Sequence, residues 1–356
     1  MTYLTRLDGL EGEVRRLCSL VIPFHNGSRS FARAIASVYE NTHLPSEIIV
    51  VDDGSHASEH KWLIEFCAGF EDISIVRTPN LGQSAARNLA VQKARFDNII
   101  FLDQDDEYLG EHVRLYCDVL EDGSCDFVFS DYECFDEVIG SNSRNSINVS
   151  RSGEISLKHI IAHGSHIIPS ALGIKKRTFL GLGGFKSYLR GFEDDDLILR
   201  LVDRDVRYRY LNQTLTRWKI HAGSGSYSPH FSFSRQQFLR DVVLTFGETR
   251  TYRTAIHFLA ARVGVHTFLE EQHDTGNESN CDGKPVGSIV DYFFETLQIA
   301  RLYGVMRLLN LLRLLNNKKF RPLVQFSLRC AAPLFAKNPV VDQRIKYWIS
   351  ANETVK

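Results

Sequence analysis

Short, mainly apolar runs along the first hundred residues alternate with segments in which apolar residues recur every three or four positions. The runs predict buried strands over residues 17–23, 47–51, 73–77 and 98–102. The intervening segments predict helices over 30–39, around 62–66 and over 84–94. Strands that alternate with helices are typical of an α/β fold whose mostly parallel sheet is flanked by helices.

The pattern changes in the second half of the chain. Two more strands are predicted over 127–132 and 167–174, followed by a short helix over 194–202. Beyond about residue 230, long helical patterns dominate. We therefore predict an α/β domain over 1–230 and a mainly helical region over 231–356.

Acidic residues directly follow two of the predicted strands. Asp52 and Asp53 follow the strand over 47–51, and Asp103, Asp105 and Asp106 follow the strand over 98–102. The carboxyl ends of parallel strands meet at one edge of a sheet, where α/β proteins bind their ligands. We therefore expect both acidic clusters at the same edge.

The second of these clusters lies in FLDQDDEY, residues 101–108. Three carboxylates within four residues repel one another unless a cation lies among them. Hard oxygen ligands suit Mg²⁺ or Mn²⁺, and a diphosphate would supply further oxygens. The alternative is a solvated acidic turn, which the neighbouring acidic strand end disfavours.

The first cluster, VDDGS at 51–55, has two interpretations. Its carboxylates can accept hydrogen bonds from a nucleobase imide or a ribose hydroxyl. Asp and Ser are also preferred helix N-caps, and one residue can fill both roles. Further along, Gly82 and Ser84 open a predicted helix whose N-terminus can face an anion, and Arg87 can reach a base or phosphate from the next turn.

Two later segments carry further candidate chemistry. Glu193 to Asp196 open a predicted helix, where acids are favoured by the helix dipole, but one of them can also act as a general base towards a hydroxyl. The others would be solvated or would pair with Arg200. His221 lies in a Gly- and Ser-rich loop and can ligate a metal or contact a diphosphate.

Taken in order, these segments resemble glycosyltransferase family 2, whose members have a GT-A fold. The resemblance runs from about Cys18 to Ser226 and rests on the blocks SLVIPFHN, IIVVDDGS, NLGQSAARN, FLDQDD, GGF, EDDDLILRL and IHAGSGS. It implies that residues 1–230 form a GT-A catalytic domain. One departure is Lys186, which stands where the family often carries an acid.

The resemblance also implies a role for each candidate residue. Those for the nucleotide-sugar pocket are Pro23, Asp53 and Arg87, with Asp52 as an alternative contact and Asp103 near the ribose. Those for the metal are Asp105 of the DxD motif, with Asp106 as a substitute, and His221 as a late metal or diphosphate contact. Those for catalysis are Asp194 as the base and Glu193 as a residue that positions the acceptor.

The expected activity is an inverting, Mn²⁺- or Mg²⁺-dependent transfer of a sugar, most often from a UDP-sugar, to a glycan or lipid-linked acceptor in polysaccharide or lipopolysaccharide synthesis. One alternative is a sugar nucleotidyltransferase, which would need a Gly-rich, basic phosphate loop where this chain has PFHNG. Another is a non-catalytic nucleotide-sugar-binding module on the same fold. The first strand is not followed by the GxGxxG of a nicotinamide enzyme.

Composition narrows the setting. A formal net charge of −1 over 356 residues gives no global attraction to nucleic acid, so we expect no nucleic-acid partner. The seven cysteines are scattered, and the beginning of the chain lacks an apolar signal core, so we expect a cytoplasmic protein.

The Leu-rich segment Thr296 to Phe320 contains regularly spaced basic residues. On a predicted helix these residues would wind around the axis and would not stay on one face. We expect it to pack in a helical subdomain or homodimer contact. The alternative is a peripheral site on the inner face of a membrane, where the basic residues meet anionic headgroups.

Overall fold

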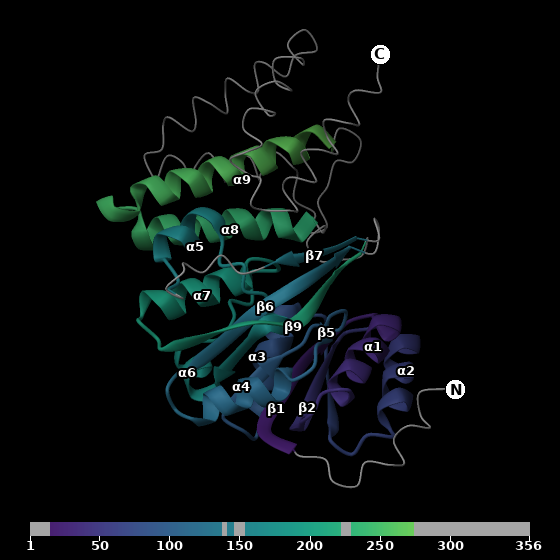
Figure 1. Ribbon diagram of the computed structural model, residues 1–356. Helices are drawn as coiled ribbons and strands as arrows, with labels where there is room; N and C mark the ends of the chain where they lie inside the picture. The colour runs from purple at the N-terminus through teal and green to yellow at the C-terminus, as the bar shows by residue number, and fades with distance from the viewer. Residues whose placement is uncertain (1–14, 137–140, 146–153, 222–228, 274–356) are drawn as a thin grey trace. The chain divides into compact units, whose positions relative to one another are not determined.

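The computed structural model describes residues 15–136, 141–145, 154–221 and 229–273 (Figure 1). The predicted segment Thr296 to Phe320 lies outside these residues. The chain divides into two compact units, the first formed by 1–157 with 165–228 and the second by 158–164 with 229–356. The assignment of separate functional roles to the two regions stays a prediction.

The first unit is built on one mixed sheet (Figure 1). Its strands β3, β2, β1 and β4 are adjacent in that order and all parallel. Beyond β4 the order continues with β8, β6, β9 and β5, and here antiparallel pairs join the parallel pair of β6 with β9. The α/β prediction is therefore confirmed, with a mixed second half that the sequence pattern did not show.

The predicted strands and helices of the parallel half are all present. The strands are β1 (Arg15–Phe24), β2 (Leu44–Asp53), β3 (Ile73–Thr78) and β4 (Asn98–Phe101). The helices are α1 (Ser28–Tyr39), α2 (Ala57–Cys67), α3 (Gln83–Lys93) and α4 (His112–Glu121). The sequence analysis did not predict α4.

The mixed half contains the later elements. Its strands are β5 (Glu107–Tyr108), β6 (Phe127–Asp136), β7 (Ser141–Asn145), β8 (Leu172–Lys175) and β9 (Tyr208–Ile220), with β7 paired to β6. Its helices are α6 (Lys176–Gly181) and α7 (Glu193–Asp203). The predicted strand over 167–174 was mostly wrong. Residues Pro169–Ala171 form a 3₁₀ turn instead, since proline has no N–H to give to a sheet.

Alternate residues of β1 pack on opposite faces of the sheet. Leu20 and Ile22 belong to a core shared with α1, α2 and α4, which includes Phe31 and Tyr116. The helix α3 packs against β1 and β2, and Phe101 of β4 meets the rings of Phe179 and Phe185. The strands β1, β2 and β4 are thus largely buried on both sides, which explains their almost continuous apolar runs, whereas β3 at the edge is partly exposed.

In the second unit the described elements are helical. They are α5 (Leu157–His163), α8 (Pro229–Phe246), a 3₁₀ turn (Arg250–Tyr252) and α9 (Arg253–His273). The helices α8 and α9 pack together, and Arg262 donates a hydrogen bond to the carbonyl of His163 at 2.5 Å. None of the described helices has the length and apolarity that a membrane crossing requires.

One buried histidine makes the stability of the first unit sensitive to acid. His112 is stacked between Tyr108 and Tyr116, with ring centroids 3.6 and 3.9 Å away, and is fully buried. Burial lowers the pKa of His112 to about 3, although its contact with the Leu215 carbonyl opposes the shift. The neutral imidazole is therefore the form that the fold accommodates.

We expect His112→Phe to reduce the acid sensitivity of the fold. In wild type the histidine of the unfolded chain binds a proton with a pKa near 6.5, whereas folded His112 has a pKa of about 3. Stability therefore falls as the pH drops through this window, by up to about 1.4 kcal/mol per pH unit. Urea unfolding between pH 7 and 4.5 should show a shallower decline for the variant. The exposed-residue variant His56→Asn is the control, and an equal decline in all three proteins would contradict the assignment.

Candidate active site

The two acidic clusters lie at the carboxyl ends of strands on either side of β1. The strand β1 is parallel to both β2 and β4, with Pro23 opposite Val51 at its end. Asp52 and Asp53 end β2, and Asp103 to Asp106 follow β4. The structure therefore brings Pro23 and both clusters to one edge of the sheet, as the strand pattern predicted.

The Asp53 carboxylate holds the loop that leads into α3. Its Oδ1 accepts hydrogen bonds from the Leu81 amide at 2.6 Å and the Thr78 hydroxyl at 2.9 Å. Its Oδ2 accepts one from the Gly82 amide at 2.7 Å. Asp53 therefore orders the segment before α3, a role compatible with the predicted nucleotide contact.

Asp52 points into the protein instead. Its side chain is fully buried, its Oδ1 accepts the Ser55 amide at 3.0 Å, and its Oδ2 lies 2.6 Å from Nδ1 of His60. Gly54, the next residue but one, has φ +73°, and a Cβ there would lie 2.4 Å from the Asn80 backbone nitrogen. These contacts shape the turn at the end of β2, and they favour Asp53 over Asp52 as the candidate for the pocket.

A glutamine that the sequence analysis did not single out joins the DxD loop to the end of β1. Gln104 accepts a hydrogen bond from the His25 amide at 2.8 Å and donates one to the His25 carbonyl at 3.1 Å. A Cβ on Gly27 would come within 2.4 Å of the Gln104 side chain. The only sequence signal was its position between Asp103 and Asp105.

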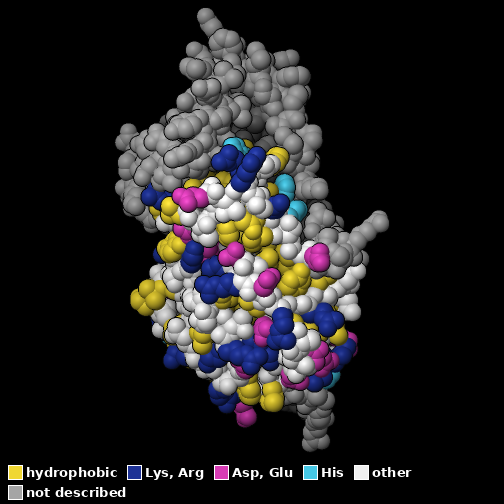
Figure 2. All heavy atoms as spheres, turned by 90° about the vertical axis from the view of Figure 1, so that its left-hand side faces the viewer, with side chains coloured by type: hydrophobic (Ala, Val, Ile, Leu, Met, Phe, Trp, Pro, Cys, Tyr) yellow, Lys and Arg dark blue, Asp and Glu magenta, His cyan; other side chains and the backbone are white. Residues whose placement is uncertain are grey.

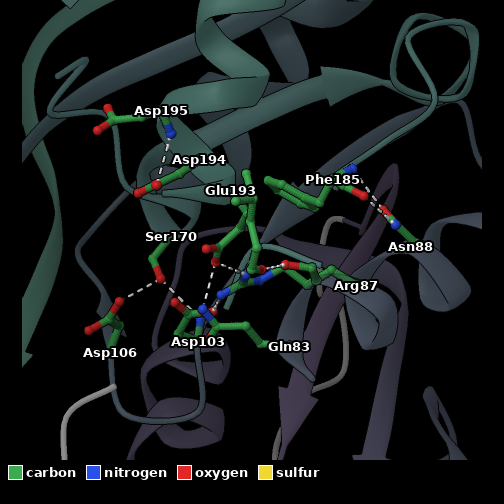
Figure 3. A network of polar contacts seen from close by, with 12 residues as sticks. Gln83, Arg87, Asn88, Asp103, Asp106, Ser170, Phe185, Glu193, Asp194 and Asp195 are labelled. Carbon is green, nitrogen blue, oxygen red and sulfur yellow. Dashed lines mark hydrogen bonds and ion pairs between the residues drawn. The ribbon is translucent and has the colours of Figure 1, made fainter. Parts of the chain in front are cut away.

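Arg87 lies between two carboxylates from distant parts of the chain (Figure 3). One terminal nitrogen of its guanidinium is 2.5 Å from Asp103, and the other is 2.9 Å from Glu193. The side chain is 1% exposed, and the guanidinium carbon lies 5.5 Å from the centre of the Phe185 ring. Burial raises the pKa of Glu193 and of Asp103, and the cation of Arg87 opposes both shifts.

The four acids at the start of α7 have different partners. Glu193 contacts Arg87 and Gln83, while Asp195 accepts the Ser165 amide at 2.5 Å. Asp196 pairs with Lys186 at 2.8 Å and with Arg200 at 2.7 Å. Among the described residues, neither Asp194 nor Asp195 has a cation at ion-pair distance. Asp195 is held by Ser165, whereas Asp194 accepts only the Asp195 amide, at 2.8 Å.

The surroundings of Asp194 make its carboxylate more basic than usual, while its role as the base stays a prediction. Burial raises its pKa well above the usual value for an aspartate, and the neighbouring carboxylates of Asp195 and Glu193 raise it further. A more basic carboxylate takes a proton from a hydroxyl more readily. Figure 3 shows its carboxylate turned away from Arg87, whereas that of Glu193 points towards Arg87.

Two predicted metal ligands, Asp105 after β4 and His221 after β9, lie in contact with each other. Nε2 of His221 lies 2.9 Å from Oδ2 of Asp105, and both side chains are partly exposed. The described residues contain no cluster of three or more His, Cys, Asp or Glu side chains suited to a metal. Two protein ligands still fit Mg²⁺ or Mn²⁺ bound with a diphosphate, because such ions use one or two carboxylates and take other oxygens from phosphates and water.

Asp106, the predicted substitute ligand, is 2% exposed and already occupied. Its Oδ2 accepts the Ser170 hydroxyl at 2.6 Å, and its Oδ1 accepts the Lys219 amide at 3.1 Å. Burial and the nearby Asp105 and Asp103 raise its pKa well above the usual value. These contacts attach the DxD loop to β9, two residues before His221, and make Asp105 the better candidate for the metal.

Ion pairs also fix β9 beside the DxD loop. Glu107 pairs with Lys219 and with Arg217, the latter at 2.9 Å, and Arg217 reaches Glu133 at 2.5 Å. The strand β9 is 13 residues long and ends directly before His221. Ser170, Lys219 and Gln83 were missed because their contacts join segments that sequence spacing cannot relate.

Solved structures share this fold. The fold is similar to that of Staphylococcus aureus TarS 1–349, with a TM-score of 0.53, 14% identity and coverage of 78% of this chain and 80% of that one. GalNAc-T7 with UDP, GalNAc and Mn²⁺ has a TM-score of 0.52 at 17% identity, covering 70% of this chain and 51% of that one. The fold is therefore GT-A-like.

Residues 19–180 match the model of Glycosyl transferase family 2, and the chain carries a glycosyltransferase domain of this family. A relative from Haemophilus influenzae, described as an uncharacterized glycosyltransferase, is 26% identical over 60% of this chain and 71% of its own length. Relatives from three Rickettsia species match over 17–20% of their own length.

The Escherichia coli protein WfaP is described as a UDP-Glc:alpha-D-GlcNAc-diphosphoundecaprenol beta-1,3-glucosyltransferase. It is 25% identical over 62% of this chain and 84% of its own length. WfgD, described by the same reaction, is 28% identical over 36% of this chain and 48% of its own length.

We expect Asp194→Asn to stabilise the fold at neutral pH. Since the folded-state pKa of Asp194 is raised, its ionisation costs stability as the pH rises through that value, and the amide avoids the cost. The melting temperature of the variant should equal that of wild type near pH 4 and exceed it by a few degrees at pH 8.

Asp195→Asn is the matched comparison for this measurement. It removes a neighbouring charge but weakens two hydrogen bonds to Ser165, so it should not give the same gain. A melting temperature for Asp194→Asn below that of wild type at pH 8 would show that the Asp194 charge is stabilised in the fold.

Proposed function

We propose that this chain is an inverting, metal-dependent glycosyltransferase that moves a sugar from a UDP-sugar to a hydroxyl of a lipid-linked or glycan acceptor in polysaccharide or lipopolysaccharide synthesis. The observation that carries the proposal is that the candidate metal ligands and the candidate base are separate groups at the sheet edge. Asp105 and His221 converge at 2.9 Å, while Asp194 is left without a cation partner on a different element.

The donor would lie along the carboxyl ends of β1, β2 and β4. Pro23 and Asp53 are the candidates for the nucleobase side, and the partly exposed Asp103 is the candidate for the ribose. Asp103 has one oxygen on Arg87, and its amide bonds to Ser170, so its position is fixed before a ligand arrives. A carboxylate held in this way can select a hydroxyl at small entropic cost.

Asp105 and His221 would hold Mn²⁺ or Mg²⁺ together with the donor diphosphate. The bound ion would neutralise charge that develops on the departing diphosphate. GalNAc-T7, a distant neighbour in fold, has been solved with UDP and Mn²⁺, which supports the choice of ion but concerns that protein.

Asp194 would accept the proton of the attacking hydroxyl. As that oxygen bonds to the anomeric carbon, the bond from this carbon to the donor phosphate oxygen breaks, and its electron pair leaves with the diphosphate. This single displacement inverts the anomeric configuration and needs no covalent enzyme intermediate. The raised pKa of Asp194 suits it to the transfer.

The acceptor is proposed from the relatives. WfaP and WfgD are described as acting from UDP-Glc on GlcNAc-diphosphoundecaprenol, so a diphospholipid-linked sugar is the first acceptor class to test. Figure 2 shows basic and acidic side chains interspersed over one face of the described residues. A cytoplasmic enzyme at the inner face of a membrane, with a C-terminal region that contacts acceptor, membrane or a second copy, would suit such a substrate.

We expect wild type with Mn²⁺ to consume at least one UDP-sugar and to add its sugar to a diphospholipid-linked acceptor, measured by mass spectrometry of the product and by UDP release. Asp105→Ala and Asp194→Asn should each reduce the transfer rate by about 10²-fold or more, because they remove a metal ligand and the base. EDTA should abolish transfer, and added Mn²⁺ should restore it.

Asp118→Asn on α4 provides the control, because its partners Arg16 and Arg114 lie outside the site. Its rate should equal that of wild type. The proposal is wrong if no nucleotide sugar is consumed with Mn²⁺ present. Binding without turnover would support the non-catalytic module, and pyrophosphate-dependent release of a nucleoside triphosphate would support a nucleotidyltransferase.

A further inference from the structure

The contacts of Glu193 and Arg87 differ from the roles that the family resemblance implies for them. That resemblance implies that Arg87 lines the nucleotide pocket and that Glu193 positions the acceptor. In the structure each is the partner of the other, at 2.9 Å, and both side chains are almost fully buried. We propose, on the basis of the proposed function, that Arg87 and Glu193 are positioning residues that hold α7 so that Asp194 faces the acceptor.

The first support is the attachment of α7 to α3. Gln83 and Arg87, one turn apart on α3, both contact Oε1 of Glu193, at 2.6 and 2.9 Å. Glu193 and Asp194 are consecutive in a helix, so their side chains point about 100° apart. Fixing Glu193 on α3 therefore fixes the direction of Asp194 (Figure 3).

The second support is that α3 also holds the segment leading into α7. The Asn88 side chain donates to the Phe185 carbonyl at 2.7 Å and accepts the Phe185 amide at 2.9 Å. Ser84 donates to the Leu189 carbonyl at 2.8 Å. The residues 83, 84, 87 and 88 form one face of α3. This face contacts the segment from Phe185 to Glu193, which leads directly to Asp194.

The third support is the second contact of Arg87. The same guanidinium binds Asp103 at 2.5 Å, beside the metal candidate Asp105. Arg87 thus links Asp103, after β4, to Glu193, at the start of α7, through the two ends of its planar guanidinium. The single compact ammonium group of a lysine does not offer this fixed geometry. The guanidinium lies over the Phe185 ring and its side chain is only 1% exposed. It is therefore placed to hold other residues of the site in position.

The test compares Glu193→Gln and Arg87→Lys with wild type by steady-state kinetics and by UDP titration calorimetry with Mn²⁺. We expect kcat to fall by about 30-fold or more in both variants, since a small misplacement of a base is costly. The KM for donor and acceptor and the Kd for UDP should stay within about threefold of wild type.

Asp118→Asn is the control, because it neutralises an acid whose partners, Arg16 and Arg114, lie outside the site. Its kcat should stay within about fivefold of wild type. Thermal unfolding shows whether each variant is folded. If Arg87→Lys does not fold, Glu193→Gln alone still tests the proposal, because its amide keeps the shape of the side chain.

Two results would overturn the inference. A tenfold or larger loss of UDP affinity in Arg87→Lys with kcat preserved would place Arg87 on the nucleotide. A raised acceptor KM in Glu193→Gln with kcat preserved would place Glu193 on the acceptor. An inactive wild type would instead overturn the proposed function and this inference with it, so the two failures are distinguishable.

Discussion

The parallel pairing of β1 with both β2 and β4 is the constraint on which the site depends. It places the carboxyl ends of three strands at one edge, and each end carries a different group: Pro23 on β1, Asp53 on β2 and the DxD loop after β4. The strands can be parallel because their apolar residues are covered on both faces by helices. The acidic candidates of the site follow where the strands leave this cover, while a polar pair within the strands, Ser19 and Glu47, is buried and joined by a hydrogen bond.

The edge then separates two kinds of electrostatic environment. On one side the carboxylates are neutralised within the protein, as Arg87 pairs with Asp103 and Glu193. Elsewhere along the edge, Asp105 and His221 stay partly exposed, and Asp194 has no cation from the described residues at ion-pair distance. A carboxylate charge that is shielded from water is costly unless a cation pairs with it. Asp194, whose pKa is raised by burial and by its acidic neighbours, therefore calls for a functional explanation.

Much of the parallel half could be predicted from sequence, because buried strands and amphipathic helices leave periodic patterns. The strand β4 and the acids after it are such a case: NIIF is continuous and apolar, and FLDQDD follows it. The mixed half was harder to predict. The two-residue β5 has no period to detect, and the chain around Pro169 is extended and apolar without belonging to a strand.

The partners of the site residues could not be predicted for a different reason. The acidic run at 193–196 is uniform in sequence, and only the fold shows that Arg87, Ser165, Lys186 and Arg200 select among its members. The contact of Gln104 with His25 and that of Asp106 with the Lys219 amide likewise join residues far apart in sequence. Such contacts depend on strand order and register, which composition and spacing do not encode.

The central claim is that the departing diphosphate and the acceptor hydroxyl activated by Asp194 lie on opposite faces of the anomeric carbon, so that transfer is one direct displacement. The most direct measurement is the anomeric configuration of the product formed from an α-linked UDP-sugar, determined by the proton coupling at the new linkage in NMR. The account predicts a β-linked product. An α-linked product would contradict it, because retention requires a second step that Asp194 as a base does not provide.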